Sequence, residues 1–178
     1  MSQDDQIAAL EARVKSLTDQ VGLLEAVVGT PGPAAWLQAA SRLKEAGQYQ
    51  LAVNAYLEVA RLDPDNASAL NGAGVLLGKH LGDLDGAEDC YDRAIAAQPG
   101  FHSPIYNLAC TAVRRGDLQR GSNLLALAIC ANERYLQLAD IDPVFEPFRT
   151  IPDIAPLLLD RNAAITHLLK LLRHSARS

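Results

Sequence analysis

Apolar residues in the first thirty positions alternate spacings of three and four without a break. In heptad terms, β-branched residues occupy the a positions and leucine the d positions. The pattern predicts a coiled-coil helix over residues 1–29 and a Gly/Pro linker at residues 30–33 that ends it. In parallel coiled coils this choice favours two strands, so we expect a homodimer through residues 7–28. The seam consists of Ile7, Leu10, Val14, Leu17, Val21, Leu24 and Val28.

The alternative for this helix is that it folds back on the rest of its own chain. A globular amphipathic helix normally has a wider apolar face than a strict a/d stripe. Here polar residues keep the stripe narrow, and this favours self-association over folding back. The flanking residues are Gln6, Glu11, Arg13, Gln20 and Glu25.

Beyond the linker, the pattern changes to one that repeats about every 34 residues. Such a period indicates helix pairs that cannot bury their apolar faces alone and must stack on their neighbours. A third, weaker copy has Gly121 and Leu125 but no proline, so we expect its second helix to run on. The clear copies have a small residue, a tyrosine and a proline at matching positions: Ala52, Tyr56 and Pro64, then Ala87, Tyr91 and Pro99.

The first helix of each pair opens near Trp36, Leu70 or Ile105 and ends at a glycine. Glycine suits a helix end because the left-handed conformation there carries no Cβ penalty. The second unit has one extra residue near residues 78–80, which predicts a longer first helix or a local bulge. The turn glycines are Gly47, Gly82 and Gly116.

With these residues the chain resembles the tetratricopeptide repeat (TPR) family, whose pattern is W-x2-L-G-x2-Y, then A-x3-F, then P. The resemblance covers residues 33–133 as units 33–66, 67–101 and 102–133. It implies an all-α fold, an α-solenoid of about three TPR helix pairs. Residues 134–178 resemble the irregular helical cap that follows many bacterial repeats, because residues 142–149 (DPVFEPFR) fit its D-P-x-[LF]-x-P-[LF]-R element.

A closing helix is expected from about Pro156 to His174, and its leucines cover more than half of its circumference. One side must pack on the repeats. The other is either a contact surface or is covered by the cap residues Phe145, Phe148 and Ile151, and the sequence leaves both open.

The resemblance also implies a partner-binding groove lined by the first helix of each unit, with Asn107 placed to hydrogen-bond an extended peptide backbone. Three basic residues end the groove helices and would attract an acidic peptide. Cations near helix C-termini also complement the helix dipole, and this explanation is the more general one. The groove residues are Leu37, Ser41, Lys44, Asn71, Val75, Lys79, Tyr106, Asn107, Cys110 and Arg114.

Composition narrows the function further. Apolar residues make up 49% of the 178 positions and charged residues 21%, which is typical of a folded chain. The net charge of −5 disfavours nucleic-acid binding. The chain has no run of 18 apolar residues and no secretory signal pattern at its start, so we expect no membrane insertion and a cytoplasmic location.

Candidate chemistry is scarce. Cys90, Cys110 and Cys130 lie twenty residues apart, but without a C-x2-C pair we expect them to pack as small apolar residues. No nucleotide-binding, hydrolase or zinc-protease motif is present, so we expect no enzyme activity, cofactor or metal. The sequence therefore predicts a non-enzymatic scaffold that binds another protein or peptide. The alternatives are an envelope or secretion-machinery assembly factor of the same architecture, or an accessory domain of an enzyme.

Overall fold

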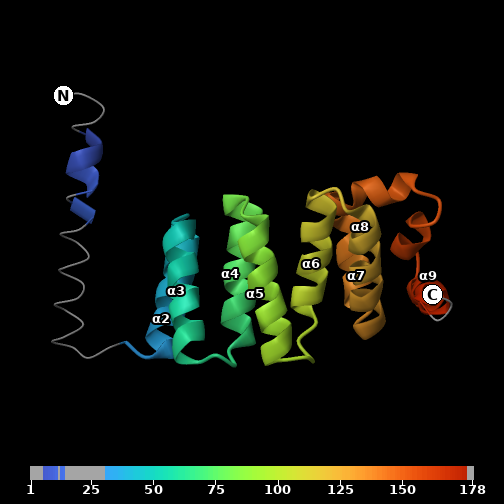
Figure 1. The fold of residues 1–178 in the computed structure, drawn as a ribbon, viewed down its shortest axis with the longest axis horizontal. Coiled ribbons are helices and arrows are strands. Elements are labelled where there is room, and N and C mark those ends of the chain that lie inside the picture. The colour runs from blue at the N-terminus through green and yellow to red at the C-terminus, as the bar shows by residue number, and fades with distance from the viewer. Residues whose placement is uncertain (1–5, 12, 15–30, 176–178) are drawn as a thin grey trace.

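The computed structural model describes residues 6–11, 13, 14 and 31–175, and within these ranges the chain forms helices and turns without a strand. Three helix pairs stand side by side along the long axis of the molecule (Figure 1). Each second helix packs on its own partner, and in the first two pairs it also packs on the first helix of the next pair. This confirms the all-α solenoid. The pairs are α2 (Pro33–Glu45) with α3 (Tyr49–Leu62), α4 (Ala67–Leu76) with α5 (Leu84–Ala97), and α6 (Ser103–Arg114) with α7 (Leu118–Ala131).

The turn inside each pair is made by a glycine with positive φ: Gly47 and Gly82 at 72° and Gly116 at 83°. The extra residue of the second unit lies just before its glycine, in a π-helix, η1 (Leu77–Leu81). A π-turn absorbs one inserted residue without breaking the helix. This confirms the expected local bulge.

Close approach of the helices depends on small residues facing tyrosines. A Cβ at Gly74 would lie 2.6 Å from Cε1 of Tyr91, and one at Gly72 would lie 3.0 Å from Cζ of Tyr56. Tyr56 and Tyr91 are 9% and 3% exposed, so both rings belong to the core of the stack. The repeating tyrosines therefore fill the space that glycine leaves on α4.

The third unit departs from the sequence expectation. Without a proline its second helix was expected to run on, but α7 ends at Ala131, and that expectation is wrong. Asn132 takes an extended conformation, with φ −154° and ψ 116°, and its side-chain Oδ1 accepts a hydrogen bond from the backbone N of Arg134 at 3.0 Å. The Asn132 side chain thus forms the turn that leads from α7 into α8, at the place where proline follows the other two units.

The cap begins at this turn. Asp142 caps η2, because its Oδ1 accepts from the backbone N of Val144 at 3.1 Å. Phe145 and Phe148 are buried against α6 and α7 and close the core of the last unit. The cap elements are α8 (Arg134–Ile141), the 3-10 helices η2 (Pro143–Thr150) and η3 (Ala155–Leu158), and α9 (Arg161–Ser175).

The closing helix α9 starts at Arg161 rather than near Pro156, which corrects the sequence expectation. Residues 155–158 form the separate turn η3, and Asp160 Oδ1 then accepts from the backbone N of Ala163 at 3.0 Å, which caps α9. The inner face of α9 packs against the cluster formed by α6, α7 and the cap, with Ala164 fully buried. Ile165 and Leu169 on its outer face stay exposed, so Phe145 and Phe148 do not cover that face.

The N-terminal seam is described only in part. Residues 6–11, 13 and 14 are helical, and Ile7, Leu10 and Val14 are 49%, 63% and 61% exposed, so these three are not buried on the repeats. The coiled coil stays a prediction. The remaining seam residues, Leu17, Val21, Leu24 and Val28, lie outside the described residues.

Candidate functional site

A cavity of about 320 Å³ opens between the second unit, the third unit and the cap. Six of the ten expected groove residues line it. Four further residues complete the wall, and three of these come from the cap. The expected residues are Val75, Lys79, Tyr106, Asn107, Cys110 and Arg114, and the added ones are Tyr91, Asp142, Pro143 and Val144.

Leu37, Ser41 and Lys44 of α2 do not line this cavity. All three lie on α2 in the first unit, whereas the cavity is formed by the second unit, the third unit and the cap.

An amide pair joins the two groove helices that meet at this cavity. Nδ2 of Asn107 on α6 donates to Oδ1 of Asn71 on α4 at 2.8 Å. Asn71 does not line the cavity, but it holds the side chain of Asn107, which does. Asn107 was expected to bind a peptide backbone, and its Oδ1 stays able to accept such a bond while its Nδ2 is used.

Arg114 is held by the π-helix of the preceding unit. Its Nη1 donates to the backbone carbonyl of Gly78 at 3.5 Å. The π-helix η1 ends where the backbone N–H groups of Gly82 and Asp83 both donate to the backbone carbonyl of Leu77. The arginine fork has five N–H donors, so the contact with Gly78 leaves others free to bind a ligand. The π-helix that holds the extra residue thus contacts a cation at the cavity.

Asp142 is the cavity residue whose place in the groove sequence reasoning missed, since it was expected only as a cap. Its Oδ2 accepts from the hydroxyl of Tyr106 at 3.2 Å, and Sγ of Cys110 lies 4.0 Å away. The signal was available: residues 142–144 are the start of the DPVFEPFR element. Only the folded cap shows that this element reaches the groove.

The ionisable thiol and hydroxyl groups at the cavity are held in their protonated forms. Burial, and then the nearby Asp142, raise the pKa of Cys110 to about 12, and burial raises the pKa of Tyr106 above its ordinary value. Both groups therefore stay protonated near neutral pH and act as donors to Asp142. Burial also raises the pKa of Cys90 to about 11. Neither Cys90 nor Cys110 is a ready nucleophile, because a thiolate is needed for attack.

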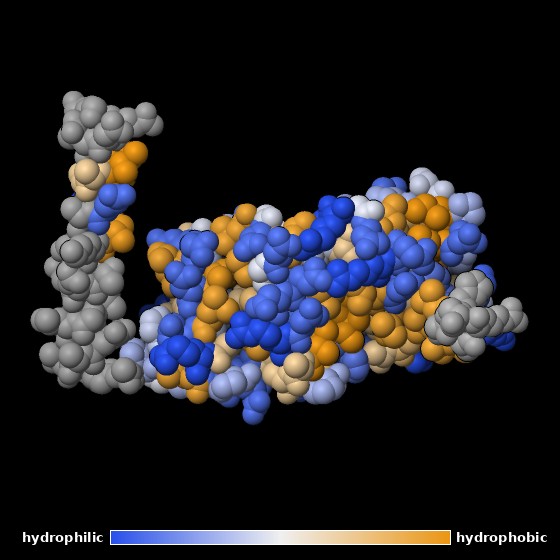
Figure 2. Space-filling model, viewed as in Figure 1, coloured by the Kyte–Doolittle hydropathy of each residue, from blue (hydrophilic) through white to orange (hydrophobic). Residues whose placement is uncertain are grey.

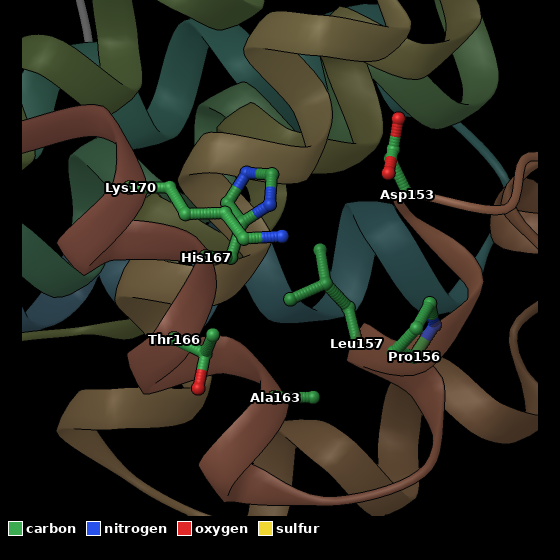
Figure 3. Close-up of a pocket in the computed structure, with 7 residues that line it drawn as sticks. All are labelled: Asp153, Pro156, Leu157, Ala163, Thr166, His167 and Lys170. Carbon is green, nitrogen blue, oxygen red and sulfur yellow. The ribbon is translucent and has the colours of Figure 1, made fainter. Parts of the chain in front are cut away.

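A second cavity, of about 200 Å³, lies in the cap (Figure 3). His167 and Lys170 reach into it from α9, and Asp153 and Leu157 face them from the segment that contains η3. His167 Nε2 lies 2.8 Å from Oδ1 of Asn123 on α7. Burial, and then the charge of Lys170, lower the pKa of His167. The neutral imidazole thus fastens α9 to α7.

Within residues 6–11, 13, 14 and 31–175, no group of three or more His, Cys, Asp or Glu side chains is placed to hold a metal ion. The three cysteines are free thiols in helices, with Cys90 and Cys110 buried and Cys130 half-buried, as expected from packing. None of the described helices combines the length and apolar character needed to cross a membrane.

Residues 40–80 match the family model of the TPR repeat. The fold is similar to that of a mutant O-GlcNAc transferase of Thermobaculum terrenum, with a TM-score of 0.58 and 26% identity over 80% of this chain. The match spans only 26% of the transferase chain. No curated protein sequence matches significantly.

Two structures of MamA are also similar. The RS-1 ArsTM double mutant has a TM-score of 0.55 and 20% identity, over 82% of this chain and 76% of its own. A second MamA crystal structure has a TM-score of 0.60 and 16% identity, over 99% of this chain and 96% of its own. At these identities the likeness to MamA shows the shared fold.

Proposed function

We propose that the chain is a non-enzymatic scaffold of the TPR type, because residues 40–80 match the TPR repeat model and stacked repeats of this kind form extended binding surfaces. Its binding site is the cavity between the second unit, the third unit and the cap. The ligand is an extended segment of a partner protein. The observation that carries the proposal is the convergence of six groove residues from two units on one cavity.

The proposed ligand segment is acidic. Lys79 and Arg114 are both exposed, and both line the cavity. An arginine fork matches a carboxylate, and a lysine adds a mobile positive charge. Both residues are also near helix C-termini, where they complement the dipole. The contact of Arg114 with Gly78 supports the binding role, since the dipole alone requires no such contact.

Lys44 provides a matched control, because it ends α2 in a similar way but does not line the cavity. The test captures partners from the native cell with the full-length chain and compares Lys79→Glu/Arg114→Glu with Lys44→Glu. We expect the double variant to lose the partner and Lys44→Glu to retain it. With the captured partner, the double variant should associate more slowly and depend less on salt, because steering is screened over about 8 Å at physiological ionic strength.

Asn107→Ala tests the backbone contact separately. It removes a short hydrogen bond, so dissociation should speed up while the salt dependence stays as in the wild type. Equal affinity of the wild type and the double variant Lys79→Glu/Arg114→Glu would exclude this cavity as the binding site.

The proposal assigns a role to each segment of the chain. Residues 33–133 carry the groove, residues 134–178 close it, and residues 1–29 associate with a second copy. Association would place two grooves in one assembly, which raises avidity by a factor of about 10² to 10⁴ when both engage one target.

A further inference from the structure

The outer face of α9 is an apolar stripe with a positively charged margin. Ile165, Leu169 and Leu172 are 41%, 49% and 65% exposed and lie four and three residues apart, which puts them on one side of the helix. The basic residues Lys170 and Arg173 are exposed beside them. Residues 161–178 contain four Lys or Arg and no Asp or Glu. An apolar face of this kind marks a contact surface.

The N-terminal segment has a similar exposed apolar stripe, and the net charge of its sequence is negative. Ile7 and Leu10 are 49% and 63% exposed, and apolar side chains are visible on the described part of this helix (Figure 2). Glu11 and Arg13 are both exposed on this described part, so the negative charge comes from residues 1–28 as a whole. Residues 1–28 contain five Asp or Glu and two Lys or Arg, so their net charge is −3.

We propose that the N-terminal helix of one copy of this chain docks on the outer face of α9 of a second copy. Pairing two N-terminal helices would bring together two segments that each have a net charge of −3. Docking on α9 instead brings the net charge of −3 of residues 1–28 to the net charge of +4 of residues 161–178. Three heptads are close to the lower limit for an independently stable coiled coil, so this charge difference decides the partner. The linker leads into α2, at the opposite end of the stack from α9 (Figure 1), so the two surfaces meet between copies.

The contact joins two different surfaces, one at each end of the chain, and is therefore heterologous. This inference rests on the self-association proposed above and is independent of the groove. It also makes a prediction about salt. Contact between opposite charges weakens as salt rises, whereas pairing of two acidic helices strengthens.

The experiment uses two full-length variants and measures mass by light scattering. The head variant carries Ile7→Asp and Leu10→Asp, and the tail variant carries Ile165→Asp and Leu169→Asp. All four positions are exposed, so circular dichroism should be unchanged. We expect each variant alone to have the mass of one chain, 19.1 kDa, and an equimolar mixture to form a complex of one copy of each. The control Ile141→Asp, at an apolar residue 77% exposed on α8, should associate like the wild type.

The other outcomes each overturn the proposal in a distinct way. A tail variant that still self-associates, beside a monomeric head variant, would leave self-association intact and assign it to the paired N-terminal helices. A head variant that still self-associates, beside a monomeric tail variant, would assign the contact to α9 alone. Two monomeric variants that fail to combine, or a monomeric wild type, would also refute the docking, and the last result would refute self-association as well.

Discussion

Asn107 on α6 donates a 2.8 Å hydrogen bond to Asn71 on α4, although the two residues occupy different positions in their repeats. Counted from the matching repeat positions Leu70 and Ile105, Asn71 lies one residue further along the chain and Asn107 two. The bond therefore does not follow from the repeat pattern. It ties the two helices together beside the cavity and orients the Asn107 side chain within it.

Replacement of Asn71 by Ala should leave the Asn107 amide without its partner and lower the free energy of unfolding by about 0.5–1.5 kcal/mol. Urea unfolding measures this change. Asn54→Ala is the matched control, because it removes an exposed amide pair with Gln50 inside α3. A surface change of that kind should stay within about 0.5 kcal/mol. Equal losses in the two variants would argue against a special role for the Asn71–Asn107 bond.

Gly74→Ala should destabilise the protein by about 1–3 kcal/mol, because the new Cβ would lie 2.6 Å from the Tyr91 ring. Gly100→Ala is the control, since a Cβ there would have no atom within 4 Å. Thermal unfolding of both variants measures the difference. A Gly74 variant as stable as the wild type would contradict this packing.

Tyr91→Ala should cost about 3–5 kcal/mol, the range for truncating a core aromatic. The ring also provides the steric conflict with position 74, so adding Gly74→Ala to Tyr91→Ala should cost less than it does in the wild type. A double-mutant cycle measures this non-additivity. Simple addition of the two losses would show that the Cβ at position 74 meets something other than the ring.

Asp142→Ala should lower the free energy of unfolding by about 0.5–2 kcal/mol, because the residue caps η2 and also accepts from the Tyr106 hydroxyl. Asp142→Asn keeps an acceptor for the cap and should lose less. Hydrogen exchange of residues 143–150 measures whether η2 is loosened. If hydrogen exchange in η2 is as slow in Asp142→Ala as in the wild type, Asp142 does not anchor η2.

Stability should fall as the pH falls below about 6.5, because burial lowers the pKa of His167 in the folded chain from 6.5. The unfolded chain then binds a proton that the folded chain resists, so the contribution of the neutral His167 is present above pH 6.5 and is lost toward the lower folded pKa. His167→Gln should reduce this slope, and the control His102→Gln should keep it. Urea unfolding between pH 5 and pH 8 measures the slopes.

The solenoid could be predicted from the sequence because its stacking uses contacts that recur with the repeat. Local structure requires particular residue types at these positions, and they can be recognised in the sequence alone. They are Tyr56, Tyr91, the turn glycines and the extra residue near Gly78. The end of α7 was not visible in this way, because no proline follows it and the chain turns into α8 at Asn132, whose backbone is extended and whose side chain accepts from the backbone N of Arg134.

The groove was predictable only in part. Helix periodicity places Lys79 and Arg114 on the groove face, but the formation of the cavity beside these two residues and away from Lys44 depends on how the units and the cap pack. Asp142 reaches the cavity only because the cap folds onto α6, a contact between residues 36 positions apart. Local sequence thus determined the helices and their repeating contacts, since those depend on near neighbours. The tertiary structure alone decided which side chains share the cavity, because that depends on packing between distant segments.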